Sequence, residues 1–284
     1  MGNRKRSGRQ QRREPIRRMI PPTRVPGSRR PRYPDETALM PVYEYSPMFG
    51  RLFDAPVEMV PLLAVLAVLH QAQSGRPVGT CVPTSHQVSG ALRHLGFEAE
   101  AVAACATLYR VTDTFTEVSE VGVWRRPPVV HPDGTTNGHM VVWTPSFAQL
   151  VDATLVQDPL LLAAAQMDPV YSTPVFVEVP TDRKEFLAAQ PVAWLDDRLY
   201  ASWVLLPDWT RRMDPVLEGE AGTVVEPGAL GLATDALRLI AAVAEERDLG
   251  AVLVQCPRLG ALLRGERQLP ESPVEPPPHP AAGM

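Results

Sequence analysis

The chain has 284 residues, of which 45% are hydrophobic, so it can bury a substantial core in one large domain or two small ones. It has no run of about 18 or more apolar residues, and its arginine-rich N-terminus lacks an apolar segment. The sequence therefore predicts neither a membrane span nor a secretory signal, and it favours a cytoplasmic protein. The formal net charge of −4 combines two segments of opposite charge.

The N-terminal segment is strongly basic. Residues 1–32 hold twelve of the 28 basic residues and a single acidic residue, Glu14. The rest of the chain carries 16 basic and 31 acidic residues, a net charge of about −15. Frequent proline and little apolar periodicity predict that residues 1–39 form a disordered tail. Two interpretations stay open: a solvated extension without a partner, and an arm that binds nucleic acid or another anionic surface.

Cysteine usage indicates free thiols. Cys81, Cys105 and Cys256 are odd in number and lack the CxxC spacing of common metal sites. This pattern is typical of a reducing compartment, in which at least one thiol is available for chemistry.

Two helices are predicted in the first half of the chain. Residues 57–73 are apolar on nearly every side, which predicts a buried helix. A second helix is predicted from Pro83 to Leu95, because apolar residues recur at helical spacing and Gly96 follows as a stop signal. Cys81 then lies at the start of this helix, where unpaired N–H groups and the helix dipole favour a thiolate and could hold an oxyanion. A buried, unreactive thiol is the competing interpretation of Cys81.

The segment after this helix predicts one strand and a long loop. Residues 97–111 are predicted to form a strand with one buried face, so Cys105 inside it is interpreted as packing. Residues 112–136 are predicted to be mainly loop, with one short strand at 121–124 and with His131 in a turn.

Residues 137–155, NGHMVVWTPSFAQLVDATL, predict a β-hairpin, because two apolar and partly β-branched segments flank a link with turn chemistry. If Trp143 faces Ala148 across the link, His139 lies directly opposite Asp152 on one face of the sheet. Opposed residues have Cβ atoms roughly 4.5 to 5.5 Å apart, a distance at which an imidazole and a carboxylate can pair. The hairpin therefore predicts a histidine that is oriented by an aspartate.

Beyond the hairpin, short strands and helices alternate, which would extend an antiparallel sheet and cover it. Trp203 and Trp209 are interpreted as core or sheet-edge residues. Residues 266–284 are rich in proline and are predicted to form a disordered tail. The elements predicted between the hairpin and this tail are a short segment at 158–168, strands at 172–180 and 198–207, a small helix at 182–190, and helices at 228–250 and 251–265, the last broken at Pro257.

Cys81, His139 and Asp152 form an ordered set of thiol, base and orienting carboxylate, the three groups that nucleophilic acyl transfer uses. The segments GTCVPTSHQVSGALRHLGFEAE, GHMVVW and LVDATL resemble three elements of the transglutaminase-like branch of the papain-like superfamily. These are its Cys helix, its His strand and its Val-Asp-Pro-Thr element, with Ala153 here in place of the proline. The resemblance covers residues 79–155. It implies an α+β fold in which a Cys-bearing helix packs on an antiparallel sheet that carries His and Asp.

The resemblance also implies a function for a single domain at residues 40–265. Cys81 would attack an amide, ester or thioester carbonyl of a peptide, protein or small acyl substrate, with His139 as base and then acid and Asp152 orienting it. No metal or organic cofactor is required, and the oligomeric state is not indicated. Two alternatives stay open: a catalytically silent fold that serves as an interaction module, and a metal site made of Cys81, His131 and His139.

Overall fold

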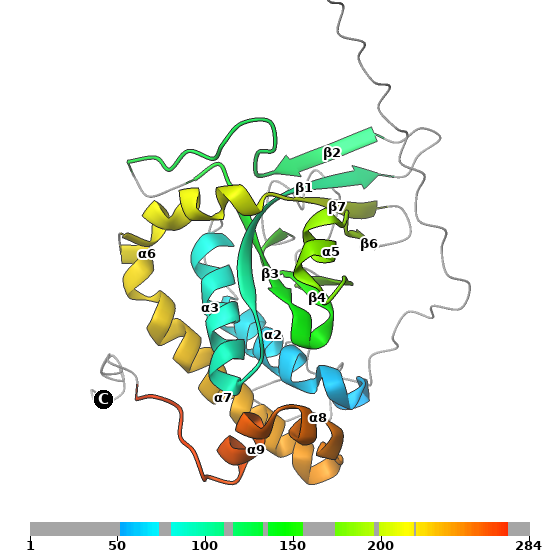
Figure 1. Cartoon of the computed structure of the whole chain (residues 1–284), viewed down its shortest axis with the longest axis vertical. Coiled ribbons are helices and arrows are strands. Elements are labelled where there is room, and N and C mark those ends of the chain that lie inside the picture. Colours follow the sequence, from blue (N-terminus) through cyan, green and yellow to red (C-terminus); the bar gives the residue numbers. More distant parts are fainter. Residues whose placement is uncertain are drawn as a thin grey trace, which may run out of the picture. The chain divides into compact units, whose positions relative to one another are not determined.

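The computed structural model of the chain combines helices with one antiparallel β-sheet, the mixed α and β class that the sequence predicts (Figure 1). The residues that the structure describes are 52–73, 81–110, 116–132, 136–155, 174–195, 199–218 and 220–271. The predicted tail 1–39, the predicted segment 158–168 and all of the predicted tail 266–284 beyond residue 271 lie outside them.

Among the described residues, seven strands form the sheet, in the order β5-β4-β3-β1-β7-β6, with β2 paired to β1. All the pairings are antiparallel, and β1 is the longest strand and joins the two halves of the sheet. The strands are β1 (Glu100–Arg110), β2 (Thr116–Val121), β3 (His139–Thr144), β4 (Gln149–Asp152), β5 (Val175–Glu178), β6 (Val192–Trp194) and β7 (Leu199–Leu205).

Three longer helices form a layer on one side of the sheet, in which α3 packs on the strands and α7 packs on α3 and α2. Helix α2 is apolar on nearly all sides and is buried on nearly all sides, as its composition predicts. Helices α3 and α7 approach each other closely, since a Cβ on Gly90 would lie 2.8 Å from that of Ala229. These helices are α2 (Val60–Gln73), which follows a 3₁₀ turn at Val57–Met59, α3 (Cys81–Leu95) and α7 (Val225–Glu246).

Shorter helices complete the fold. Helix α5 covers the other face of the sheet, where the Phe186 ring stacks on Trp143 with centroids 4.6 Å apart. The predicted break at Pro257 is confirmed, because that residue begins a new helix. The 3₁₀ helix η6 and strand β6 are not predicted from the sequence. The bounds are α5 (Arg183–Ala188), η6 (Pro207–Glu218), α6 (Glu220–Thr223), α8 (Gly250–Gln255) and α9 (Pro257–Leu263).

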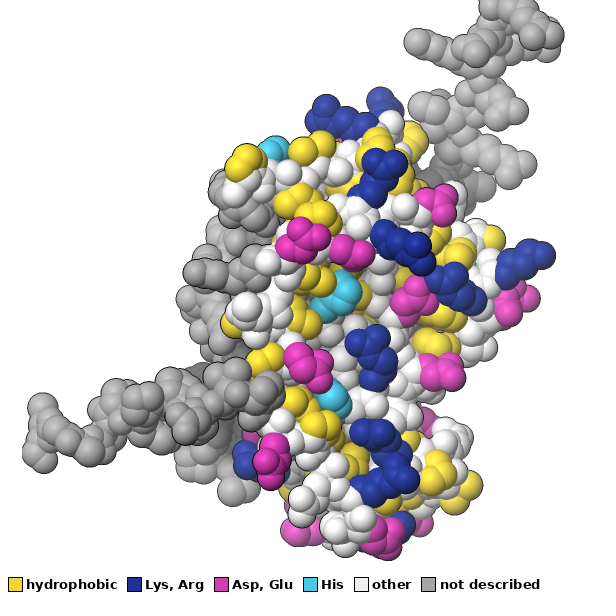
Figure 2. All heavy atoms as spheres, turned by 60° about the vertical axis from the view of Figure 1, so that its left-hand side comes forward, with side chains coloured by type: hydrophobic (Ala, Val, Ile, Leu, Met, Phe, Trp, Pro, Cys, Tyr) yellow, Lys and Arg dark blue, Asp and Glu magenta, His cyan; other side chains and the backbone are white. Residues whose placement is uncertain are grey.

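Helix α7 is the one described helix whose length and mean hydropathy would suit a membrane span. One side of it is buried against α2 and α3, while charged residues such as Asp235 and Arg238 pair on its exposed side. This division is that of an amphipathic core helix. Figure 2 shows acidic and basic side chains interspersed over the face turned forward there.

The hairpin forms, but its predicted register is wrong by two residues. Trp143 lies opposite Leu150, whereas the sequence predicts Ala148 as its partner. The link contains a 3₁₀ turn at Pro145–Phe147, after which Ala148 adopts a left-handed conformation at φ 52°. A shift of two residues keeps each side chain on its predicted face, because side chains alternate with a period of two. The His139–Asp152 contact is therefore diagonal across the hairpin and not directly opposed.

The loop prediction for residues 112–136 also needs one correction. The short strand predicted at 121–124 is wrong, because β2 ends at Val121 and residues 122–124 are irregular. Gly122 has φ 86°, in the left-handed region, and this conformation turns the chain out of the strand.

Candidate active site

Cys81 is the first residue of α3, as the sequence predicts. The helix is fixed to the sheet by buried side chains along one side and by the Ser85 hydroxyl, which donates to the Met140 carbonyl oxygen at 2.9 Å. Its start lies against the beginning of β3, where the Cys81 thiol donates weakly to the Gly138 carbonyl oxygen at 3.8 Å. The helix therefore places the Cys81 sulfur beside Gly138, the residue that precedes His139.

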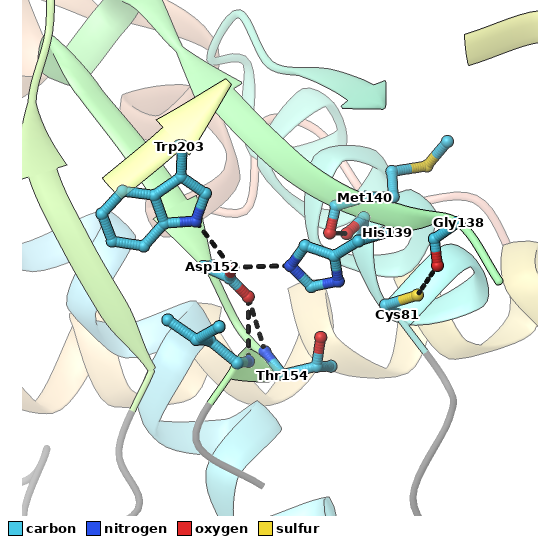
Figure 3. Close-up of polar contacts among 9 residues, drawn as sticks. Cys81, Gly138, His139, Met140, Asp152, Thr154 and Trp203 are labelled. Atoms are coloured by element: carbon cyan, nitrogen blue, oxygen red, sulfur yellow. Dashed lines mark hydrogen bonds and ion pairs between the residues drawn. The ribbon is translucent and has the colours of Figure 1, made fainter. Parts of the chain in front are cut away.

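The side chains of Cys81 and His139 approach each other around the N-terminal end of β3. Met140 packs with Cys81 on the face of the sheet that α3 covers. His139, its neighbour, points to the opposite face by strand alternation. Because His139 is the first residue of β3, no further strand residue separates its ring from the start of α3. In Figure 3 the imidazole lies between Asp152 and Cys81, with one ring nitrogen directed to each side.

The imidazole of His139 is 1% exposed and uses its two nitrogens differently. Nε2 donates to Asp152 Oδ2 at 2.7 Å. Nδ1, on the side of Cys81, is buried without a hydrogen-bond partner among the described residues. This nitrogen is free to accept a proton from the thiol.

Asp152 is fully buried, and each of its oxygens accepts two hydrogen bonds. Oδ2 accepts from His139 and from the indole N–H of Trp203 at 2.8 Å, whereas Oδ1 accepts from the backbone N–H groups of Leu155 at 2.9 Å and Thr154 at 3.2 Å. Burial alone would raise the pKa of this carboxyl, but the charge of His139 and the donated hydrogen bonds lower it below its ordinary value. Asp152 is therefore ionised inside the protein.

The pairing with Asp152 also determines the pKa of His139. Burial alone would lower the pKa of His139, but the charge and hydrogen bond of Asp152, with a contribution from the neighbouring Cys81, raise this pKa to about 10. The raised pKa favours the imidazolium that forms when Nδ1 takes the proton of the Cys81 thiol. Such an imidazolium can stabilise a thiolate at Cys81 and can supply a proton to a leaving group.

Sequence reasoning missed three donors to Asp152. Trp203 is a core residue, as predicted, but its hydrogen bond to the carboxylate depends on the position of β7, which lies 51 residues further along the chain. The backbone donors at Thr154 and Leu155 do have a local signal, since an aspartate at the end of a strand often accepts from the N–H groups that follow it. The hydroxyl of Thr154 is buried without a hydrogen-bond partner in the described part of the chain.

The other candidates lie elsewhere. His131 is exposed, in contrast to the buried Cys81 and His139. The described residues contain no group of three or more His, Cys, Asp or Glu side chains that could hold a metal ion. Cys105 donates to Glu120 at 3.2 Å, and Cys256 to the Leu95 carbonyl oxygen at 3.4 Å.

Compared with protein-family models, curated proteins and solved structures, the chain gave no match. Its class is therefore defined by its own geometry. It is a mixed α and antiparallel-β protein in which a cysteine at a helix start lies beside a buried histidine–aspartate pair.

Proposed function

We propose that the protein is a cysteine-nucleophile acyl-transfer enzyme with a transglutaminase-like core. The observation that carries this proposal is the asymmetry of the His139 ring, in which Asp152 accepts from Nε2 while Nδ1, on the Cys81 side, has no hydrogen-bond partner among the described residues. A base that is oriented on one nitrogen and free on the other is what activation of a thiol requires.

In the proposed reaction, His139 Nδ1 takes the thiol proton and the Cys81 sulfur attacks a carbonyl carbon of an amide, ester or thioester. Asp152 stabilises the resulting imidazolium. The tetrahedral intermediate collapses as the imidazolium gives its proton to the departing amine, alcohol or thiol, which leaves an acyl group on the sulfur. Water or an amine then attacks this thioester with His139 as base, and the thiol is regenerated. The acyl donor is a peptide, a protein or a small acyl compound.

Intact-protein mass spectrometry after incubation with 4-nitrophenyl acetate tests this proposal. We expect one acetyl group on Cys81 and a burst of 4-nitrophenol of one equivalent. The acetyl group should persist when Cys105 and Cys256 are both replaced by alanine, and it should be lost in Cys81→Ala. His139→Gln should slow acetylation by about 100-fold or more, the usual contribution of a general base. Acetylation of Cys81 no faster than that of the other two thiols would contradict the enzyme proposal.

A second candidate is a catalytically silent fold that acts as an interaction module. The burial of the site favours it, because Cys81 is only 9% exposed and a substrate needs access to the sulfur. If Cys81 is inert towards both the ester and iodoacetamide near neutral pH, and Cys81→Ser leaves the cellular phenotype unchanged, this second candidate replaces the first.

A further inference from the structure

Trp203 makes an unusual contact for a core tryptophan. Its side chain is completely buried from strand β7, among apolar neighbours that include Leu150 and Phe186. The indole Nε1–H donates to Asp152 Oδ2 at 2.8 Å, the oxygen that also accepts from His139 at 2.7 Å. Figure 3 shows the indole and the imidazole approaching this carboxylate from different sides.

The donors around Asp152 fix its carboxylate in one orientation. The backbone N–H groups of Thr154 and Leu155 hold Oδ1, so a rotation of the carboxylate would break several hydrogen bonds inside the core. Trp203 is the donor to Oδ2 that cannot titrate, since an indole N–H only donates. It therefore binds the carboxylate in the same way whether or not His139 carries its second proton.

We propose that Trp203 is a positioning residue of this site, whose indole N–H orients Asp152 and takes up part of its negative charge, so that His139 stays directed at Cys81 and can release its proton. The role in acyl transfer rests on the proposed function. The role in the charge balance of the buried pair does not, because it follows from the contacts alone.

The charge sharing has a definite direction. A hydrogen bond to Oδ2 reduces the negative potential that Asp152 exerts on the imidazolium. Without this donor the full charge would act on His139, which would then hold its proton more tightly. A general acid and base works best when its affinity for the proton suits the operating pH, so this moderation favours turnover. The titratable groups that act most strongly on the pair are Cys81 from α3 and the two partners themselves.

The substitution Trp203→Phe tests the inference, because it keeps a large aromatic side chain and removes the N–H. Trp143→Phe is the matched control. Trp143 lies in the same apolar cluster and is also buried, but its indole donates to the Pro180 carbonyl oxygen at 3.2 Å and not to Asp152. Both variants lose one indole hydrogen bond, and only Trp203→Phe loses a bond to the carboxylate.

The measurement is the titration of the His139 ring nitrogens by NMR on the full chain labelled with ¹⁵N-histidine, assigned with His139→Gln. In Trp203→Phe we expect the midpoint to rise by about one pH unit, because the carboxylate then acts on the imidazolium with its full charge. In Trp143→Phe we expect it to stay within a few tenths of the wild-type value. Equal midpoints in the two variants, or a fall in Trp203→Phe, would overturn the inference.

A measurement on the wild-type protein covers the case in which Trp203→Phe does not fold. The indole N–H resonance of Trp203, assigned by replacing the other tryptophans in turn, should change position at the pH at which His139 titrates. A resonance that does not respond to this titration would refute the shared carboxylate.

These readouts separate the inference from the proposed function, because neither needs turnover. If the His139 midpoint moves as expected while Cys81 is not acetylated, Trp203 is a positioning residue in a silent site. If Cys81 is acetylated and the midpoint does not move, the enzyme proposal stands and the inference fails.

Discussion

The two sides of the His139 ring are built in opposite ways. On the sheet side, Nε2 contacts a carboxylate whose oxygens accept four hydrogen bonds. On the helix side, Nδ1 has no hydrogen-bond partner among the described residues, and the Cys81 thiol contacts the Gly138 carbonyl oxygen at a long distance of 3.8 Å. A buried polar atom without a hydrogen-bond partner costs free energy, so Nδ1 does not add to the stability of the site.

This difference separates the contacts that stabilise the site from the atoms that are available to react. The sheet side should carry the stability of the arrangement, and the helix side its reactivity. Substitutions on the two sides should therefore have opposite profiles, with large changes in free energy of unfolding on one side and large changes in thiol chemistry on the other.

The largest expected effect on stability is that of Asp152→Ala. It leaves an imidazole, an indole N–H and two backbone N–H groups without their acceptor in the core. We expect the free energy of unfolding to fall by about 3 to 5 kcal/mol, as when one partner of a buried pair is removed. Urea denaturation followed by circular dichroism measures this change.

The exposed ion pair between Arg183 and Glu100, 2.6 Å long, provides the control for that measurement. Both side chains are largely in water, so Arg183→Ala should change the free energy of unfolding by no more than about 1 kcal/mol. Similar losses from the buried and the exposed pair would contradict the division between the two sides of the ring.

The pairing of His139 with Asp152 should make the stability of the protein depend on pH. The pKa of His139 is raised from 6.5 in the unfolded chain to about 10 in the folded protein. Its contribution to stability is therefore complete below about pH 6.5 and is lost as the pH rises towards 10. Urea midpoints measured across this window should fall with pH, and Asp152→Asn should flatten the slope. An equally steep slope in that variant would assign the effect to other groups.

An intermediate effect is expected from Gly122→Ala. Gly122 has φ 86°, and a Cβ there would lie 2.8 Å from both the Ala104 carbonyl oxygen and the His139 Cβ. We expect a loss of about 1 to 3 kcal/mol from backbone strain and crowding, with slower acetylation of Cys81 as the imidazole is displaced.

Gly231→Ala is the matched control for this substitution. Gly231 lies within α7, and a Cβ there would meet nothing within 4 Å. We expect this variant to gain about 0.5 to 1 kcal/mol, because alanine loses less conformational entropy in a helix than glycine does. Thermal unfolding of the two variants should thus move in opposite directions from the wild type.

A small effect on stability is expected from Cys81→Ala, on the helix side. It removes one sulfur atom and a weak hydrogen bond, so the free energy of unfolding should change by about 1 kcal/mol or less. The same substitution should abolish acetylation. A loss as large as that of Asp152→Ala would identify Cys81 as a structural residue.

The sequence predicts the local parts of this site, because they depend on periodicity. Helical spacing places Cys81 at a helix start, and strand alternation places His139 and Asp152 on one face. The register escapes prediction, since it depends on the left-handed conformation of Ala148, an unusual one for a residue with a side chain. His139 and Asp152 still lie on one face of the sheet, because the predicted register is wrong by two residues, which is an even number.

Long-range contacts are the part that sequence patterns do not contain. In the sheet, β3 lies between β4 and β1, and β1 lies between β3 and β7. The hydrogen bond from Trp203 to Asp152 depends on this order of strands. Nothing near either residue specifies that order of strands. The 3₁₀ helix η6 is likewise not predicted from the sequence, because Pro215 lies inside it and a proline within a segment argues against a helix.

The burial of Cys81 has a consequence for the rate at which its thiol reacts. A thiol that is 9% exposed beside an imidazole that is 1% exposed can react with a reagent only after the surrounding residues move apart. At high reagent concentration the rate of modification should therefore stop increasing, at a limit common to reagents of different intrinsic reactivity. That limiting rate is the opening rate of the protein itself, and it would also set the upper bound on turnover in the proposed acyl transfer.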